Sequence, residues 1–149
     1  NAKEIIGSIL DLGKTEISIL KNFAFIENKV CLHTDESLMP SNKEEWCSWN
    51  VNKNSNSEFV TYWMNNLQDL KTSKNIFVSI GDFRVGDNKE HRSMIYEHPF
   101  YNLDTFLGQK NVDDIQGLNN TFYSGAYLGY GFHEDGINSA LKVSKLIER

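Results

Sequence analysis

The sequence contains few cysteines, only Cys31 and Cys47 in 149 residues. Small secreted scaffolds depend on several paired cysteines, so a disulfide-stabilised fold is disfavoured and a reducing, cytoplasmic location is expected. Basic residues are also in deficit, because 15 Lys and Arg oppose 20 Asp and Glu for a net charge of −5. A chain without a basic field does not attract phosphate backbones, which argues against a general nucleic-acid-binding protein.

Long apolar runs are missing as well. The stretch at residues 76–80 is among the longest, and a bilayer span needs ~18 to 20 apolar residues. No charged-then-apolar leader opens the chain, so neither a transmembrane segment nor an export signal is expected. The chain starts at Asn1 rather than Met, and its first residues resemble the interior of a helix. We therefore expect it to be a piece of a longer protein.

The sequence does contain enough apolar material for a core. Hydrophobic residues make up 40% of the chain and aromatic residues 12%. A chain of this size and composition buries most of its surface on folding, which argues against intrinsic disorder. We expect a single domain, residues 1–149.

Two kinds of apolar spacing predict the secondary structure. Helical spacing predicts helices at residues 3–12, from 15 to about 23, at 64–70, around 103–107 and at the C-terminus. Alternating spacing predicts strands at residues 28–34, 46–51, 58–64, 76–80, 93–97 and 121–124. In the last helix, the stripe expected to be buried consists of Ile137, Ala140, Leu141, Ser144 and Ile147. A polar loop at residues 52–57 makes a hairpin, so an α+β fold with a mostly antiparallel sheet and flanking helices is expected.

The chain ends in a predicted strand, a glycine-rich loop and a final helix. The glycines are Gly125, Gly129, Gly131 and Gly136, and the aromatic residues among them are Tyr127, Tyr130 and Phe132. Glycine lets a ligand approach the main chain, and the first N–H groups of a helix can receive an electron-rich group. The aromatic residues suit a planar ring ligand. The alternative is a tight connection in which Asp135 caps the helix.

The segment from Gly125 to Gly136, with Ser139 and Ala140, resembles the C-terminal signature of a bacterial branch of the FAD-containing amine oxidoreductases. Shorter segments agree with that family in the same order. They are Leu32-His33-Thr34-Asp35, Leu38-Met39-Pro40, Ser48-Trp49-Asn50, Val60-Thr61-Tyr62-Trp63-Met64-Asn65 and His98-Pro99. The resemblance extends over residues 15–147.

This resemblance implies that the chain is the C-terminal portion of an FAD-dependent oxidoreductase. Residues 15–120 then belong to the substrate domain, and residues 121–149 supply the strand, loop and helix that complete the FAD domain. The family holds FAD chiefly through an N-terminal Rossmann-like half with a Gly-x-Gly-x-x-Gly turn. This chain has no such turn. The expected partners are that missing half and a small-molecule substrate, and FAD is expected to bind this chain alone weakly or not at all.

The resemblance also assigns roles to residues. The cofactor contacts it implies are Gly125, Tyr127, Gly129, Tyr130, Gly131, Phe132, His133, Glu134, Asp135 and Gly136. Relatives often carry an acidic residue after the first of these glycines, where this chain has Ala126. His133 is the candidate catalytic residue, because a histidine accepts a proton near neutral pH. A role in positioning the cofactor or capping the helix is the alternative for His133.

Trp49, Tyr62 and Trp63 are the candidates for lining the substrate pocket. Adjacent Tyr62 and Trp63 must face opposite sides of a strand, so at most one of them points into a cleft. Cross-strand aromatic pairs of an ordinary sheet are the alternative. No metal site is expected, because Cys31 and His33 share a strand face without a second pair of ligands.

Two functions of different classes remain open at this point. The first is part of an FAD-dependent oxidoreductase that acts on an apolar or amine substrate. The second is a non-enzymatic α+β interaction module, whose glycine loop only turns and whose exposed aromatic residues meet a protein partner. If half of an enzyme is missing, the chain is expected to expose an apolar seam and to self-associate through it. The flavin absorbance of the complete protein separates these hypotheses.

Overall fold

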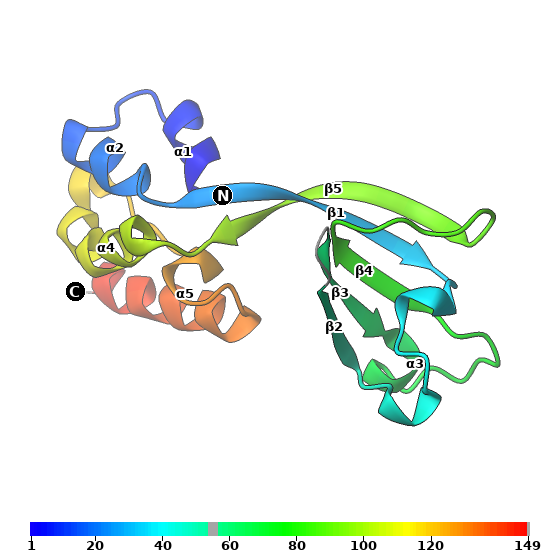
Figure 1. Ribbon diagram of the computed structural model, residues 1–149. Helices are drawn as coiled ribbons and strands as arrows, with labels where there is room; N and C mark the ends of the chain where they lie inside the picture. Colours follow the sequence, from blue (N-terminus) through cyan, green and yellow to red (C-terminus); the bar gives the residue numbers. More distant parts are fainter. Residues whose placement is uncertain (54–56, 149) are drawn as a thin grey trace. The chain divides into compact units, whose positions relative to one another are not determined.

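The structure is a computed structural model that describes residues 1–53 and 57–148. The chain forms two compact units (Figure 1). The helical unit comprises Asn1–Ile26 and His98–Arg149, and the sheet unit comprises Glu27–Glu97. The α+β class predicted from the sequence is confirmed, with one antiparallel sheet and flanking helices. The prediction of a single domain that belongs to a longer protein stays a prediction.

The sheet has five strands in the order β2-β3-β4-β1-β5. Their bounds are β1 Ala24–His33, β2 Trp49–Lys53, β3 Glu58–Trp63, β4 Phe77–Gly81 and β5 Glu90–Phe100. The predicted hairpin is confirmed, since β2 and β3 pair antiparallel with Trp49 opposite Tyr62. The middle of its predicted loop, residues 54–56, lies outside the described residues. β1 and β5 are longer than their apolar alternation predicts.

One face of the sheet unit is closed by its own loops. Phe59, Phe83 and Val85 pack with Cys31 in a buried cluster, and Leu38 packs against it. The buried positions on β1, β3 and β4 alternate with more exposed ones, as the period of two requires. This alternation gives the sheet one packed face and one open face.

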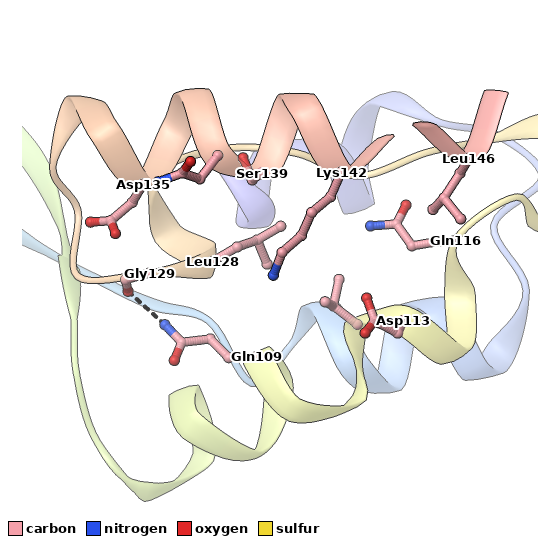
Figure 2. A pocket seen from close by; sticks show the side chains of 11 residues that line it. Gln109, Asp113, Gln116, Leu128, Gly129, Asp135, Ser139, Lys142 and Leu146 are labelled. Carbon is pink, nitrogen blue, oxygen red and sulfur yellow. Dashed lines mark hydrogen bonds between the residues drawn. The ribbon is translucent and has the colours of Figure 1, made fainter. Parts of the chain in front are cut away.

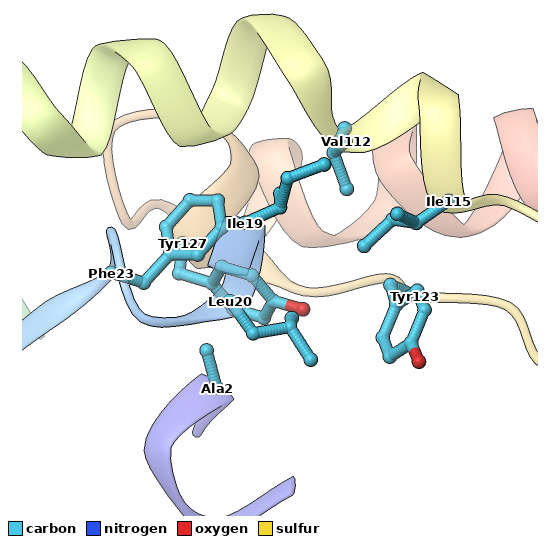
Figure 3. Close-up of a cluster of buried hydrophobic side chains, with 8 residues drawn as sticks. All are labelled: Ala2, Ile19, Leu20, Phe23, Val112, Ile115, Tyr123 and Tyr127. Carbon is cyan, nitrogen blue, oxygen red and sulfur yellow. The ribbon is translucent and has the colours of Figure 1, made fainter. Parts of the chain in front are cut away.

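The helical unit contains α1 Ala2–Ser8, α2 Lys14–Leu20, α4 Leu103–Asn111 and α5 His133–Ile147, whereas the short α3 Met64–Leu67 lies in the sheet unit. Residues from both stretches of the chain form the core of the helical unit (Figure 3). The buried cluster consists of Ala2, Ile19, Leu20, Phe23, Val112, Ile115, Tyr123 and Tyr127. The first helix is shorter than predicted and ends at Ser8, after which Ile9 takes an extended conformation.

The strand predicted at residues 121–124 does not form. The segment is irregular, and the side chain of Gln116 takes the place of a neighbouring strand. Gln116 Nε2 donates to the carbonyl of Tyr123, and Gln116 Oε1 accepts from the N–H of Tyr123, both at 2.8 Å. A single side-chain amide thus satisfies both backbone groups of Tyr123, as a neighbouring strand would.

The prediction of a buried stripe on the last helix is wrong. The predicted stripe residues Ile137, Ala140, Leu141, Ser144 and Ile147 are all exposed. The residue that α5 buries is Ser139, whose hydroxyl accepts from Gly125 N–H at 2.9 Å. The apolar side of α5 therefore has no partner among the described residues. Within residues 1–53 and 57–148, no helix combines the length and the apolar character needed to cross a membrane.

Candidate functional site

The glycine-rich loop ends at α5, and close contacts fix its path. Gly129 leaves no room for a side chain, because a Cβ atom there would overlap the carboxyl group of Asp135. Gly131 has φ +89°, and a Cβ atom on it would lie 2.7 Å from the hydroxyl of Tyr101. L-residues rarely adopt that φ. Both positions therefore require glycine for the loop itself, whatever else the loop binds.

Asp135, the third residue of α5, ties the loop to the start of its own helix, because its carboxylate accepts from the loop and from the N-cap residue. Its Oδ2 accepts from the N–H of Tyr130 at 3.0 Å and from the N–H of Phe132 at 2.9 Å. The next amides, those of His133, Glu134 and Asp135, meet no hydrogen-bond acceptor in the described part of the chain. The start of this 15-residue helix therefore offers free N–H donors to a ligand.

Two exposed aromatic residues precede these free donors in the loop, and the Tyr130 ring lies near that of Tyr101, with centroids 6.3 Å apart. Tyr130 is 69% exposed and Phe132 is 60% exposed. A surface hollow at this place is lined by Gly131, Phe132, His133 and Glu134. The third predicted aromatic residue is placed differently, since Tyr127 is buried in the core and packs edge-on against Phe23 with ring centroids 4.8 Å apart. Tyr127 is thus not presented beside the hollow.

Gly136 differs from the other glycines of the loop. It lies inside α5, and a Cβ atom there would meet nothing closer than 3.7 Å, the backbone nitrogen of Ala126. The local fold does not require glycine at this position, although glycine weakens a helix interior. The Cα of Gly136 is in the first turn of α5, next to the free donors. His133, the predicted catalytic residue, is exposed, and no described residue holds its imidazole by a hydrogen bond.

A polar cavity of about 180 Å³ lies between α5 and the α4 region. Figure 2 shows Lys142 of α5 extending into it, with Asp113 and Gln116 on the other side. Gln109 lines its floor and donates from Nε2 to the carbonyl of Gly129 at 2.7 Å. The predicted site residues Gly129 and Asp135 thus contact this cavity as well as the loop surface. The role of Gln109 was not predicted, because no local pattern links α4 to the loop.

The aromatic residues predicted to line a substrate pocket are divided between the faces of the sheet unit. Trp49 and Tyr62 lie on the open face, where their rings form an edge-on pair with centroids 5.2 Å apart. Trp63 lies on the opposite face and packs against Trp46 with centroids 5.3 Å apart. Its Nε1 donates to Asn75 at 3.1 Å. Trp63 is therefore part of the packing, as the alternation of adjacent residues required.

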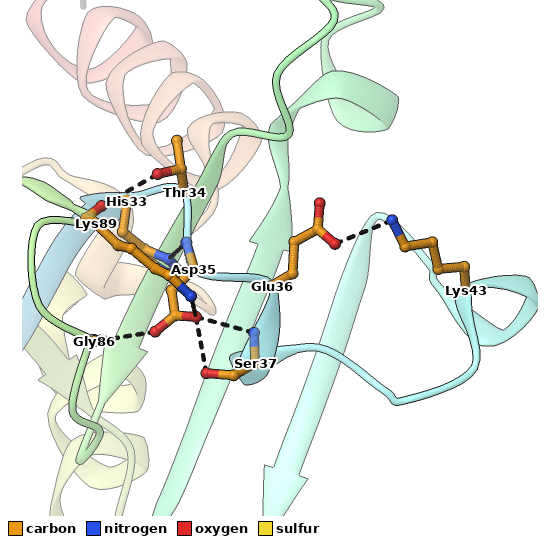
Figure 4. A network of polar contacts seen from close by, with 8 residues as sticks. All are labelled: His33, Thr34, Asp35, Glu36, Ser37, Lys43, Gly86 and Lys89. Carbon is orange, nitrogen blue, oxygen red and sulfur yellow. Dashed lines mark hydrogen bonds and ion pairs between the residues drawn. The ribbon is translucent and has the colours of Figure 1, made fainter.

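Asp35 joins two loops of the sheet unit through a buried carboxylate (Figure 4). It accepts from Ser37 N–H and the Ser37 hydroxyl, from Gly86 N–H at 2.7 Å, and from Lys89 Nζ at 2.9 Å. Burial by itself raises the pKa of Asp35, but these donors outweigh it and hold the pKa well below its usual range. The sequence signal for this site was the Asp-x-Ser spacing, which caps the short turn Glu36–Leu38.

His33 is fully buried beside this carboxylate, and both of its ring nitrogens are occupied. Nδ1 accepts from the N–H of Asp35 at 3.1 Å, so Nε2 carries the proton and faces the Ser79 hydroxyl at 2.8 Å. The Ser79 hydroxyl in turn bonds Thr61 at 2.7 Å. Burial lowers the pKa of His33 to about 4. His33 is thus a neutral structural residue, with no nitrogen left for a metal.

No model of a known protein family matches the chain, and no curated protein matches it. The function is therefore argued from the residues and from the geometry described above.

Proposed function

We propose that this chain is the C-terminal part of an FAD-dependent oxidoreductase, in which the start of α5 contacts the flavin and the open sheet face contacts the substrate. The observation that carries the proposal is the exposed start of α5, with free N–H groups on His133, Glu134 and Asp135. A cytoplasmic location belongs to the same proposal, and the free thiol of exposed Cys47 suits a reducing compartment.

The charges at the start of α5 select the part of the cofactor that fits there. The carboxylates of Glu134 and Asp135 lie in the first turn and repel a phosphate. The carbonyl oxygens of an isoalloxazine ring are neutral acceptors and suit free N–H donors. The exposed ring of Phe132 lines the hollow at these donors and provides planar apolar surface, and the exposed ring of Tyr130 lies in the same loop. The fit is therefore to the flavin ring, and the phosphates are left to another part of the enzyme.

The chemistry of such an enzyme comes from its cofactor. Bound FAD supplies an acceptor for a hydride from the substrate. The residues of this chain orient the ring through the amides of α5, exclude water with Tyr130 and Phe132, and hold the loop through Asp135. His133 stands at the first position of α5 and is the side chain proposed to hold or move a proton there.

Gly136 provides a test that separates binding from folding. In the complete protein that contains this sequence, Gly136→Val should lower bound FAD severalfold while the melting temperature changes little, because a Cβ atom at this position meets nothing closer than 3.7 Å. Gly7→Val in α1 is the matched control, since a Cβ atom there meets nothing within 4 Å. FAD is measured by absorbance after release from the protein. Full FAD content in Gly136→Val, or a complete protein without FAD, would reject the proposal.

His133→Ala separates the two roles proposed for that residue. A role in proton transfer predicts a loss of roughly 10² to 10⁴ in turnover and a changed pH profile. A positioning role predicts a modest loss with an unchanged profile and full FAD content. The isolated chain of 149 residues should not retain FAD through gel filtration, because it lacks a pyrophosphate cradle.

A further inference from the structure

The open face of the sheet unit carries apolar residues in two complete rows across four strands. One row is Trp49, Tyr62, Val78 and Leu32, and the other is Val51, Val60, Ile80 and Val30. Each residue lies directly opposite the next on the neighbouring strand. None of the eight side chains is charged. Trp49 is 56% exposed and Val51 is 71% exposed, so the β2 side of both rows is open to a ligand.

The dimensions of the two rows favour a small molecule over a protein partner. Neighbouring strands are ~4.8 Å apart, so four strands span about 14 Å, and rows two residues apart are separated by about 7 Å. Even with a side-chain width added at each edge, this area falls well short of the ~800 Å² that each partner of a stable complex buries. At one end, the rows stop at the ion pair between Lys53 and Glu58, with N to O at 3.3 Å.

The two rows themselves include two hydrogen-bond donors, both at one corner. The indole N–H of Trp49 and the hydroxyl of Tyr62 have no hydrogen-bond partner among the described residues, whereas the indoles of Trp46 and Trp63 each have one. A ligand oxygen near this corner would satisfy them. None of the eight row side chains is charged, and Glu58 at one end is paired with Lys53, so the rows themselves hold no counter-charge for a cation.

We propose that these two rows bind a neutral, elongated, largely apolar molecule with one hydrogen-bond acceptor near an end, such as a ketone, an ester or an ether. An alkylammonium ion would lose hydration on this surface without gaining a partner. The proposal rests on the proposed function only in taking this molecule to be the substrate that is oxidised. Binding to the rows does not depend on flavin.

The test uses the 149-residue chain and a neutral fluorescent probe, N-phenyl-1-naphthylamine. Competition compares 2-decanone, decane and decylammonium chloride. We expect 2-decanone to displace the probe at a concentration about tenfold or more below that needed for decylammonium. Equal displacement by the two would overturn the assignment of a neutral ligand.

Two variants locate the site. Val51→Glu places a charge at the open β2 edge of the rows and should abolish the probe signal, whereas Leu103→Glu, an exposed leucine of α4, should leave it unchanged. Trp49→Phe keeps an aromatic ring without the N–H, and should reduce the preference for 2-decanone over decane while probe binding persists, because only the Tyr62 hydroxyl remains as a donor. Circular dichroism melting confirms that each variant is folded. Equal losses in Val51→Glu and Leu103→Glu, or an unchanged preference in Trp49→Phe, would overturn the proposal.

The outcomes distinguish this inference from the proposed function. Probe binding with these specificities, together with a complete protein that lacks FAD, would leave the apolar site standing and reject the oxidoreductase. FAD in the complete protein, without probe binding to the rows, would support the oxidoreductase and reject the apolar site.

Discussion

The hydroxyl of Tyr123 donates a hydrogen bond of 2.5 Å to Oε1 of Glu16, which lies 107 residues earlier in the chain. The other carboxylate oxygen of Glu16 accepts from Gly13 N–H at 2.8 Å. Glu16 is only 1% exposed, so these donors replace the water that its carboxylate gives up on folding. Burial, together with this bond to Glu16, raises the pKa of Tyr123 far above its usual value.

Removal of that hydroxyl should be costly. We expect Tyr123→Phe to lower the free energy of unfolding by about 1–3 kcal/mol, because it leaves one oxygen of a buried carboxylate without a donor. Tyr127→Phe in the same cluster is the control, since the Tyr127 hydroxyl is buried without a partner among the described residues. That control should be neutral or stabilising. Urea denaturation measures both, and equal effects of the two substitutions would contradict the expectation.

His33 should make the protein less stable in mild acid. The unfolded chain protonates this histidine near pH 6.5, and the folded chain does so only near pH 4, because burial lowers the pKa. The contribution of neutral His33 to the free energy of unfolding is therefore complete above pH 6.5 and is lost as the pH falls toward 4. Between pH 7 and pH 5 the free energy of unfolding should fall by on the order of 2 kcal/mol. His33→Gln should flatten this dependence and exposed His91→Gln should not, which urea denaturation at each pH checks.

Asp35 should contribute to stability through both loops that it joins. Asp35→Asn removes the charge that Lys89 pairs with and weakens the acceptor for Gly86, so a loss of about 2–4 kcal/mol is expected. Asp87→Asn, in the same loop as Gly86 and exposed, should change little. Because the pKa of Asp35 is lowered in the folded state, its contribution is present above about pH 4 and disappears at lower pH. Acid titration of the wild type and the variant tests this difference.

The two cysteines should differ in their reactivity. Cys47 is exposed, whereas Cys31 is fully buried, and burial raises the pKa of the Cys31 thiol. A thiol reagent should modify one group in the native chain and both groups in urea. Cys47→Ser should leave the native chain unreactive. Rapid modification of Cys31 in the native variant would show that β1 is less protected than its burial indicates.

The exposed apolar side of α5 should cause the isolated chain to self-associate. Leu141 is 54% exposed on that side, so Leu141→Glu should shift sedimentation toward the monomer without a loss of stability. Leu10→Glu is the control, because Leu10 is exposed on a loop away from α5 in sequence. A wild-type chain that stays monomeric at high concentration would contradict this expectation.

Local signals predicted the elements that depend on local residues. The β2–β3 hairpin follows from alternation and a polar loop, and the glycines of the α5 loop follow from the requirement for positive φ at Gly131. The segment at 121–124 was misread as a strand because its partner is the side chain of Gln116. The spacing of apolar residues does not reveal that a side chain takes the place of a partner strand.

The prediction of a buried stripe on α5 was wrong for a different reason. Helical periodicity shows that Ile137 and Leu141 share a side, but not whether this chain covers that side. The two apolar rows of the sheet face illustrate the same limit, since their assembly requires the register of four strands. The sequence therefore predicted the candidate site in the glycine-rich loop before α5. It did not predict the two apolar rows, because they come from four strands that are distant in the sequence.

The helical unit is made from two stretches of chain that are separated by the whole sheet unit. During synthesis, Ile19 and Leu20 leave the ribosome long before Val112 and Ile115, with which they form the buried cluster. β2, β3 and β4 are consecutive in the sequence and in the sheet, so they can pair while that cluster is still incomplete. Residues 1–26 therefore stay without their packing partners until the whole sheet unit and the segment that follows it have been synthesised.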